Sequence, residues 1–225
     1  STLTLKLVAC DSSVAGVGCG HETPPEDPLI AKTVGLAMGS PFGGYGTTFV
    51  REQAERFVDS IAFTAYRKEI FERVGLHDER FVTGQDGELN LRLRRAGYKL
   101  LYTPDTLVYH HKKDSISKFF KHMLKYGHAR VQMIKKHPSS FRFVYVLPSL
   151  FVVVLLLLGA LSLLSRAALY LFVLLVGVYF TCAFASAVLT ASRHGLKHVV
   201  LLPAIYFVEH VGYGLGFLSG LLRKG

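Results

Sequence analysis

Three long apolar stretches in the last third of the chain limit its fold more than any other feature. Residues 143–164 and 167–192 carry no charged side chain, and residues 199–222 carry only Glu209 and His210 as acidic or basic groups. Each stretch is longer than the roughly 18–20 residues that a helix needs to cross a hydrocarbon core about 30 Å thick. Helices buried in a soluble core are the alternative, but the rest of the chain is too short to surround them. The pattern therefore predicts a membrane protein with about three transmembrane helices, together forming a region at 143–225.

The positive charge of the chain is concentrated directly before the first apolar stretch. Residues 1–109 hold 12 Lys and Arg against 14 Asp and Glu, whereas residues 110–142 hold nine Lys and Arg against Asp114 alone. A basic block beside a membrane span is typical of a cytoplasmic flank in contact with anionic headgroups. Nucleic-acid binding is the other interpretation, but no nucleic-acid-binding module is recognisable around the block. We therefore expect membrane lipids as a partner and no nucleic acid.

Residues 113–142 are expected to form an amphipathic helix and a basic linker. Ser115 is a suitable N-cap, and the helix would run to His137-Pro138. One helical face collects the apolar positions, and the lysines lie mostly elsewhere. The apolar positions are Ile116, Phe119, Phe120, Met123, Leu124, Gly127 and Ile134. A helix in a soluble core would show the same pattern, but the adjoining spans favour a helix lying on the membrane surface.

Residues 1–112 alternate short helical and strand-like segments, which predicts an α/β layer. Strands are expected at 1–9, 14–18, 57–63, 98–102 and 106–110, with Thr103-Pro104-Asp105 as a turn between the last two. Helices are expected from Asp27-Pro28 to Met38, at 66–75 and at 86–96, and the glycine-rich residues 39–46 form a loop.

Asp86 stands at the start of the helix expected at 86–96. A carboxylate there is stabilised by the helix dipole, typically by about 0.3–1 kcal/mol. Asn90 shares its helical face and Arg94 lies one turn further along. From spacing alone, Asp86 is therefore interpreted as an acid at the helix start that the helix dipole stabilises.

Four longer stretches carry a more specific signal. They are "SPFGGYG" (40–46), "AYRKEIFERVGLHDERF" (65–81), "QDGELNLRLRRAG" (85–97) and "KYGHARVQMIKKHP" (125–138). Together they resemble family 2 glycosyltransferases with a GT-A fold, most of all the membrane-bound enzymes of exopolysaccharide assembly of the succinoglycan-biosynthesis type. The resemblance covers residues 11–142 by motif and 143–225 by architecture. It implies that residues 1–112 are the acceptor-side half of a GT-A domain.

The resemblance also implies a reaction. Such an enzyme transfers a sugar from a nucleotide-sugar donor to a lipid-linked or polysaccharide acceptor, by an inverting single displacement at the cytoplasmic face of the cell membrane. Asp86 would be the catalytic base, and Gln85 and Arg130 would contact the donor diphosphate or the acceptor. His110 would be a ligand of a divalent cation, Mg²⁺ or Mn²⁺. Read without the family, His110 is a histidine at a strand end and Arg130 is a headgroup contact.

The chain departs from the family pattern at its start. Family members carry a "PxYNE"-like strand, a nucleotide-binding half and a D-x-D metal motif before this region, and these are absent here, since Asp11-Ser12-Ser13 is not D-x-D. The resemblance also places residues 1–10 at the end of a helix. We therefore expect part of an enzyme: a fragment, a truncated gene product, or one half of a split enzyme whose donor half is a second chain. A non-catalytic membrane partner that retains the fold is the alternative.

The last apolar stretch leaves the membrane topology open. If residues 1–142 are cytoplasmic, three full spans put Arg223 and Lys224 outside, against the positive-inside tendency, although Arg193 and Lys197 fall inside. A re-entrant or interfacial last segment would remove the conflict. Gly212, Gly216 and Gly220 form a small-residue stripe that permits close helix contact. Glu209 and His210 are expected to face protein or a polar groove, and an interhelical hydrogen bond is favoured over a direct role in acceptor binding.

Overall fold

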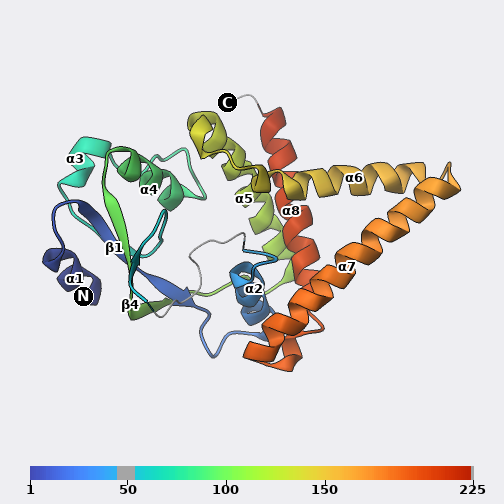
Figure 1. Cartoon of the computed structure of the whole chain (residues 1–225), viewed down its shortest axis with the longest axis horizontal. Helices are drawn as coiled ribbons and strands as arrows, with labels where there is room; N and C mark the ends of the chain where they lie inside the picture. The colour runs from blue at the N-terminus through green and yellow to red at the C-terminus, as the bar shows by residue number, and fades with distance from the viewer. Residues whose placement is uncertain (45–53, 224–225) are drawn as a thin grey trace. The chain divides into compact units, whose positions relative to one another are not determined.

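The computed structural model describes residues 1–44 and 54–223 and divides the chain into two compact units. The first unit comprises residues 1–26 and 46–111 and carries the β-sheet. The second comprises residues 27–45 and 112–225 and is helical (Figure 1). Of the loop expected at 39–46, Tyr45 and Gly46 lie outside the described residues. The α/β layer followed by an all-α region is the expected fold class, and it is confirmed.

The first unit is built on a mixed four-stranded sheet with the order β2-β4-β1-β3. The strands are β1 (Val14–Glu22), β2 (Arg56–Phe57), β3 (Thr64–Tyr66) and β4 (Lys99–Tyr109). β1 runs parallel to β4, whereas β3 on β1 and β2 on β4 are antiparallel. The long central strands β1 and β4 thus fix the positions of the short edge strands β3 and β2, which pair with them.

In the described part of the first unit, the sheet is covered by α1 (Thr2–Ala9), α3 (Ile70–Val74) and α4 (Gln85–Arg95). One sheet face and the α3–α4 layer share a core of Ala15, Val58, Ile61, Ile70, Leu89, Leu93, Leu100 and Tyr102. The smaller core with α1 consists of Leu7, Val14, Val17 and Leu101. Leu89 and Leu93 are fully buried, so the inner face of α4 is set by its leucines at four-residue spacing.

The strand expected at residues 1–9 is wrong, because these residues form α1. Ser1 caps the helix by accepting a hydrogen bond from the Thr4 amide at 3.3 Å. The Arg67 guanidinium closes its other end by donating to the carbonyls of Leu7 at 2.8 Å and Cys10 at 2.7 Å. These tertiary contacts override the alternation of the short segment, and the helix implied by the family resemblance is what forms.

Two further strand predictions are wrong. Of residues 57–63 only Phe57 is in a strand, since the rest is a connection fastened to α4. The strands expected at 98–102 and 106–110 are one strand, β4. In it the register jumps from Thr103, opposite Cys19, to Leu107, opposite Gly20. Pro104 therefore sits in a bulge, where its missing N–H costs no ladder hydrogen bond.

The second unit contains the helices expected after residue 112 and one short helix from the first half of the chain. They are α2 (Leu29–Gly39), α5 (Ile116–Lys136), α6 (Leu147–Leu161), α7 (Arg166–His194) and α8 (Leu202–Leu222), with 3₁₀ turns at Pro138–Ser140, Phe143–Tyr145 and Leu196–His198. Ser115 caps α5 as expected. Among the described residues, three segments are long and apolar enough to cross a membrane, namely Phe143–Leu161, Arg166–His194 and Leu202–Leu222.

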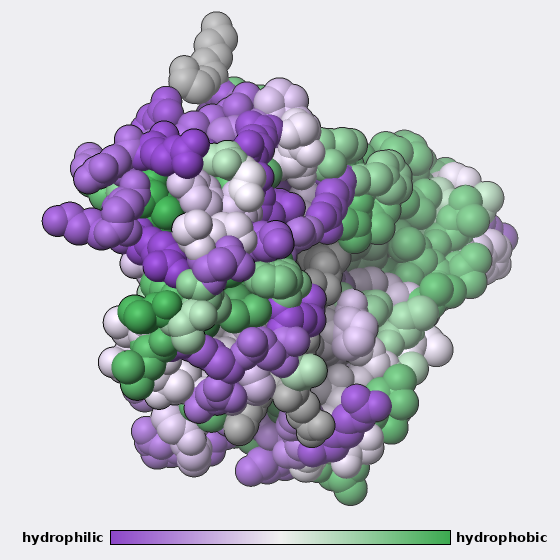
Figure 2. All heavy atoms as spheres, turned by 60° about the vertical axis from the view of Figure 1, so that its left-hand side comes forward, coloured by the Kyte–Doolittle hydropathy of each residue, from purple (hydrophilic) through white to green (hydrophobic). Residues whose placement is uncertain are grey.

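The exposed apolar surface of the second unit lies on α6 and α7. Leu156, Leu163, Leu164, Tyr170 and Leu174 are each more than 60% exposed. Figure 2 shows one face of the molecule, with a continuous hydrophobic area over the helical hairpin. Two antiparallel helices with such a surface form a hairpin suited to lipid.

The interface between α5 and α8 depends on glycine. A Cβ atom at Gly216 would overlap the backbone of Leu124, and one at Gly127 would overlap the backbone of Tyr213 and Phe217. A side chain at either position would push the helices apart. The small-residue stripe predicted from the sequence is therefore a contact surface, in the manner of membrane helix pairs.

We expect Gly216→Ala to destabilise the second unit by about 1–3 kcal/mol, the usual cost of overpacking. Gly177→Ala is the matched control, since Gly177 lies within a helix where an added Cβ meets nothing within 4 Å. Thermal unfolding of the two variants in detergent checks the prediction. Equal unfolding temperatures would contradict it.

Candidate active site

The chemistry suggested by the sequence centres on the first turn of α4. Gly84 precedes this helix with a φ of +80°, a conformation that glycine adopts without strain. The described residues provide no side-chain cap for the helix, and Asp86 and Glu88 are the acids of its first turn. The sharp turn at Gly84 thus leads directly into the two carboxylates, which have different environments.

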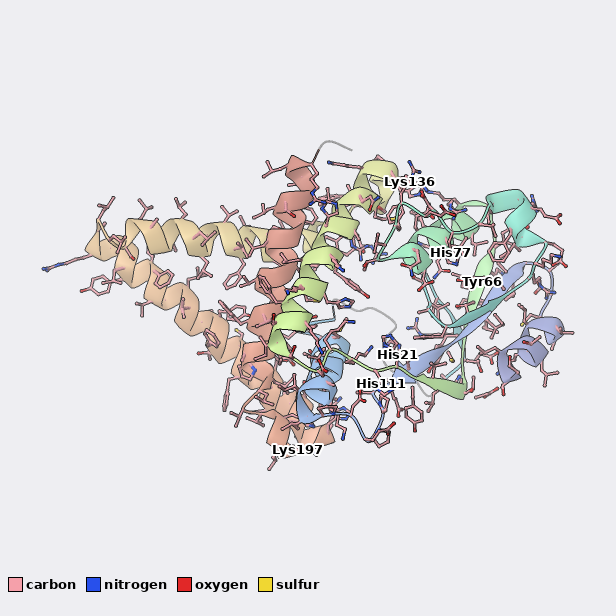
Figure 3. The ribbon with its side chains drawn as sticks, turned by 180° about the vertical axis from the view of Figure 1, so that it is seen from behind. His21, Tyr66, His77, His111, Lys136 and Lys197 are labelled. Atoms are coloured by element: carbon pink, nitrogen blue, oxygen red, sulfur yellow. The ribbon has the colours of Figure 1, made fainter. Side chains whose placement is uncertain are left out.

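Asp86 is half-buried, and its carboxylate makes no hydrogen bond or ion pair with another described residue. Burial raises the pKa of Asp86, and electrostatic attraction to His77 opposes this shift. Figure 3 labels His77 and Tyr66, which both interact electrostatically with Asp86. A carboxylate with a raised pKa and an uncommitted oxygen is suited to accept a proton.

Glu88 is fully buried and is committed to an ion pair. Its carboxylate accepts two hydrogen bonds from Nε of Arg92, at 3.0 and 2.9 Å. The same guanidinium donates to the carbonyl oxygens of Val74, of Gly75 at 3.1 Å and of Leu76 at 2.7 Å. Glu88 and Arg92 therefore fasten the end of α3 to α4, so Glu88 has no free oxygen for chemistry.

The polar strip that follows Asp86 on α4 holds the segment before β3. Asn90 donates from Nδ2 to the Ile61 carbonyl at 2.7 Å and to Ser60 Oγ at 3.1 Å. Arg94 pairs with Asp59 at 2.8 Å. These residues share a face with Asp86, as the spacing predicted, but their contacts are structural.

Tyr66 interacts electrostatically with Asp86, and no sequence pattern pointed to this residue. It lies in β3, opposite Gly16 of β1, and its hydroxyl donates to Asn90 Oδ1 at 2.8 Å. Burial, together with the nearby charge of Asp86, raises the pKa of Tyr66 to about 12. The phenol therefore stays protonated at neutral pH and fixes Asn90, one helical turn after Asp86.

His110 follows β4 directly and lies in an aromatic cluster with His21 and Phe63. The ring centroids of His110 are 5.6 Å from His21 and 5.5 Å from Phe63. Phe63 has a φ of +51°, a strained value for a bulky residue. His21 is five residues further along β1 than Gly16, the position opposite Tyr66, so this cluster lies further along the sheet than Tyr66.

The described residues of the first unit do not form a metal centre by themselves. Within residues 1–44 and 54–223, no group of three or more His, Cys, Asp or Glu could hold a metal ion. His110 and His21 would supply two nitrogen ligands at most. The divalent cation implied by the resemblance would need oxygen ligands from outside these residues.

The other two expected site residues have separate positions. Gln85 is the first residue of α4, half-buried and adjacent to Asp86. Arg130 is in α5 of the second unit, where its guanidinium lies over the ring of Tyr145, 4.0 Å from the centroid. That stacking holds the guanidinium in a fixed plane.

Comparison with known proteins gives a consistent result. The profile of a family described as "Glycosyl transferase family group 2" matches residues 41–191. The chain is 28% identical over 214 residues to the dolichyl N-acetyl-alpha-D-glucosaminyl phosphate 3-beta-D-2,3-diacetamido-2,3-dideoxy-beta-D-glucuronosyltransferase of Methanococcus voltae, covering 95% of this chain. It is 25% identical over 191 residues to the succinoglycan biosynthesis protein ExoA of Rhizobium meliloti (strain 1021), covering 85% of this chain.

A shorter match is 46% identical over 114 residues to the O-antigen biosynthesis protein RfbC of Myxococcus xanthus, covering 45% of this chain and 9% of that protein. No solved structure matches the chain. The chain spans 62% of the length of the Methanococcus voltae relative and 56% of that of ExoA.

Proposed function

Because the chain belongs to glycosyl transferase family group 2, we propose that it is the acceptor-side part of a membrane glycosyltransferase. The donor is a nucleotide sugar, and the acceptor is a lipid-linked sugar or a growing polysaccharide. The single observation that carries the proposal is the Asp86 carboxylate. It is half-buried at a helix start with a raised pKa, while the neighbouring Glu88 is locked in an ion pair.

In the proposed reaction, Asp86 takes the proton from an acceptor hydroxyl. The freed oxygen forms a bond to the anomeric carbon, and the bond from that carbon to the nucleoside diphosphate breaks. The nucleoside diphosphate leaves with the bonding electrons, so one carboxylate is enough and the sugar configuration inverts. Gln85, adjacent to Asp86, would orient the acceptor.

Arg130 has a separate proposed role toward an anionic group. A guanidinium binds a diphosphate with two parallel hydrogen bonds, and its stacking on Tyr145 would fix the orientation of that fork. The basic residues around α5 would keep the catalytic part at the cytoplasmic face of the membrane.

The test is sugar transfer in membranes that contain this chain together with a nucleotide-binding half. Radiolabelled nucleotide sugars are supplied one at a time, and the label is followed into the organic-solvent extract and into polymer. We expect one donor to label the lipid extract or the polymer, with inverted anomeric configuration. Absence of transfer from every nucleotide sugar would favour the non-catalytic membrane partner.

A further inference from the structure

The three apolar helices of the second unit differ in how much of each is covered by protein. In each candidate span we compare the buried share of an apolar 18-residue window. This share is 56% in α8, 17% in Phe143–Leu161 and 11% in α7. Among the half-exposed residues of α8, Phe207, Val208, Val211, Leu215 and Leu218 form a narrow apolar stripe along one face. α6 and α7 thus offer lipid-facing surface around much of their circumference, whereas α8 offers one edge.

The helix that covers most of α8 is the amphipathic helix α5, and the two helices run in the same direction. Positions along α8 meet successive positions along α5: Gly212 faces Met123, Gly216 faces Leu124, and Gly220 faces Val131. At the far end, Lys135 Nζ donates to the carbonyl oxygens of Gly220 at 3.1 Å and Arg223 at 2.7 Å. The two helices therefore share one depth and one tilt in any membrane.

The lysines of α5 limit how deeply the α5–α8 pair can lie in the bilayer. Lys121 and Lys125 lie in the middle of α5, next to the glycine contact with α8, and both are exposed. If α8 crossed the bilayer, these lysines would stand near its centre, at a cost of about 2.5–3.5 kcal/mol each on insertion scales. In the plane of the interface, the same lysines reach the headgroups and cost little.

Contacts of the first half of α8 also indicate a position at the membrane surface. His210 Nε2 lies 3.0 Å from the Phe42 carbonyl oxygen, in the irregular segment after α2. His198, just before α8, lies 2.8 Å from the Thr33 hydroxyl of α2, a helix of only 11 residues. Irregular backbone and a helix too short to span are ordinary at the membrane surface and rare at lipid-exposed depth.

The α6–α7 hairpin extends in another direction. In Figures 1 and 3, which view the structure from opposite sides, α6 leads away from the α5–α8 pair and α7 returns, while α8 lies along α5. A hairpin that crosses the bilayer would therefore leave the α5–α8 pair across its base.

We propose that α8 lies in the membrane interface beside α5, so that the chain crosses the bilayer only twice, through α6 and α7. The partner of the α5–α8 surface is the lipid of a single leaflet, with the apolar stripe of α8 toward the acyl chains. Arg193, Lys197 and Arg223 then stand on the same side as the basic block at 110–142, and the conflict with the positive-inside tendency disappears.

The test is cysteine labelling with a membrane-impermeant maleimide, in the full chain expressed in a bacterial membrane. Cys10, Cys19 and Cys182 are first replaced by alanine. Three single cysteines are then compared: Leu76→Cys for the first unit, Leu164→Cys for the α6–α7 turn, and Arg223→Cys for the end of α8. The first two positions are 72% and 85% exposed.

We expect Arg223→Cys to react from the same side as Leu76→Cys, and Leu164→Cys from the opposite side, in spheroplasts and in inverted vesicles. Reaction of Arg223→Cys from the Leu164→Cys side would establish a third span and overturn the proposal. A C-terminal fusion gives a second measurement. Fluorescence of a fused green fluorescent protein would support the two-span topology, whereas activity of a fused alkaline phosphatase would exclude it.

Discussion

Asp86→Asn is expected to lower sugar transfer by about 10²–10⁴-fold, the usual contribution of a general base. Asparagine has almost the same shape as aspartate but cannot take the proton of the acceptor hydroxyl. The loss should appear in kcat, since the acceptor still binds, and it is measured with the completed enzyme in membranes. Glu72→Gln is the matched control, because Glu72 is an exposed acid on the neighbouring helix α3. Unchanged turnover in Asp86→Asn would rule out Asp86 as the base.

The same substitution should leave the protein as stable as before, or more stable. Burial raises the pKa of Asp86, so the folded protein holds this proton more tightly than the unfolded chain. The contribution of Asp86 to stability is then fully present below its unfolded pKa and is lost as the pH rises through its folded pKa. At neutral pH the ionised carboxylate therefore opposes folding, and asparagine removes that cost.

A pH–rate profile tests the role of Asp86 independently. Transfer should fall as the pH is lowered through the raised pKa of Asp86, because the base must be ionised to accept a proton. This acidic limb should be absent from the residual activity of Asp86→Asn. An identical limb in both proteins would assign it to another group.

The sequence was sufficient for features that depend on periodicity and length. The three apolar helices, the amphipathic helix α5 with its Ser115 cap, and the helix that begins at Gln85 follow from local patterns, which the structure confirms. Predictions from local patterns were wrong where contacts with distant residues determine the secondary structure. Arg67 stabilises α1 from 57 residues beyond Cys10, and the pairing of β4 with β1 carries the strand through Pro104.

The candidate site divides in the same way. Sequence resemblance selected Asp86, but spacing could not distinguish it from Glu88, two residues away. That distinction comes from Arg92, whose guanidinium binds Glu88 and the end of α3 at once. Tyr66 lies in β3, which pairs with β1, and no local pattern predicts this long-range pairing or the interaction of Tyr66 with Asp86.

Glu88→Ala is expected to destabilise the protein by about 3 kcal/mol, since removing one partner of a buried ion pair leaves the other charge uncompensated. Arg92 is only 18% exposed and Glu88 is fully buried, so water can replace little of the lost interaction. The measurement is the thermal unfolding midpoint in detergent, together with the rate of proteolysis between α3 and α4.

Two further variants separate the charge from the shape of Glu88. Glu88→Gln keeps the length and one hydrogen-bond acceptor for Arg92, so we expect a smaller loss than in Glu88→Ala. Glu79→Ala removes an exposed acid before α4 and should change the midpoint little. If Glu88→Ala unfolds at the same temperature as Glu79→Ala, the Glu88–Arg92 pair does not hold α3 on α4. If instead it unfolds early while Asp86→Asn stays folded and inactive, the two acids of one helical turn are separated into a structural and a catalytic group.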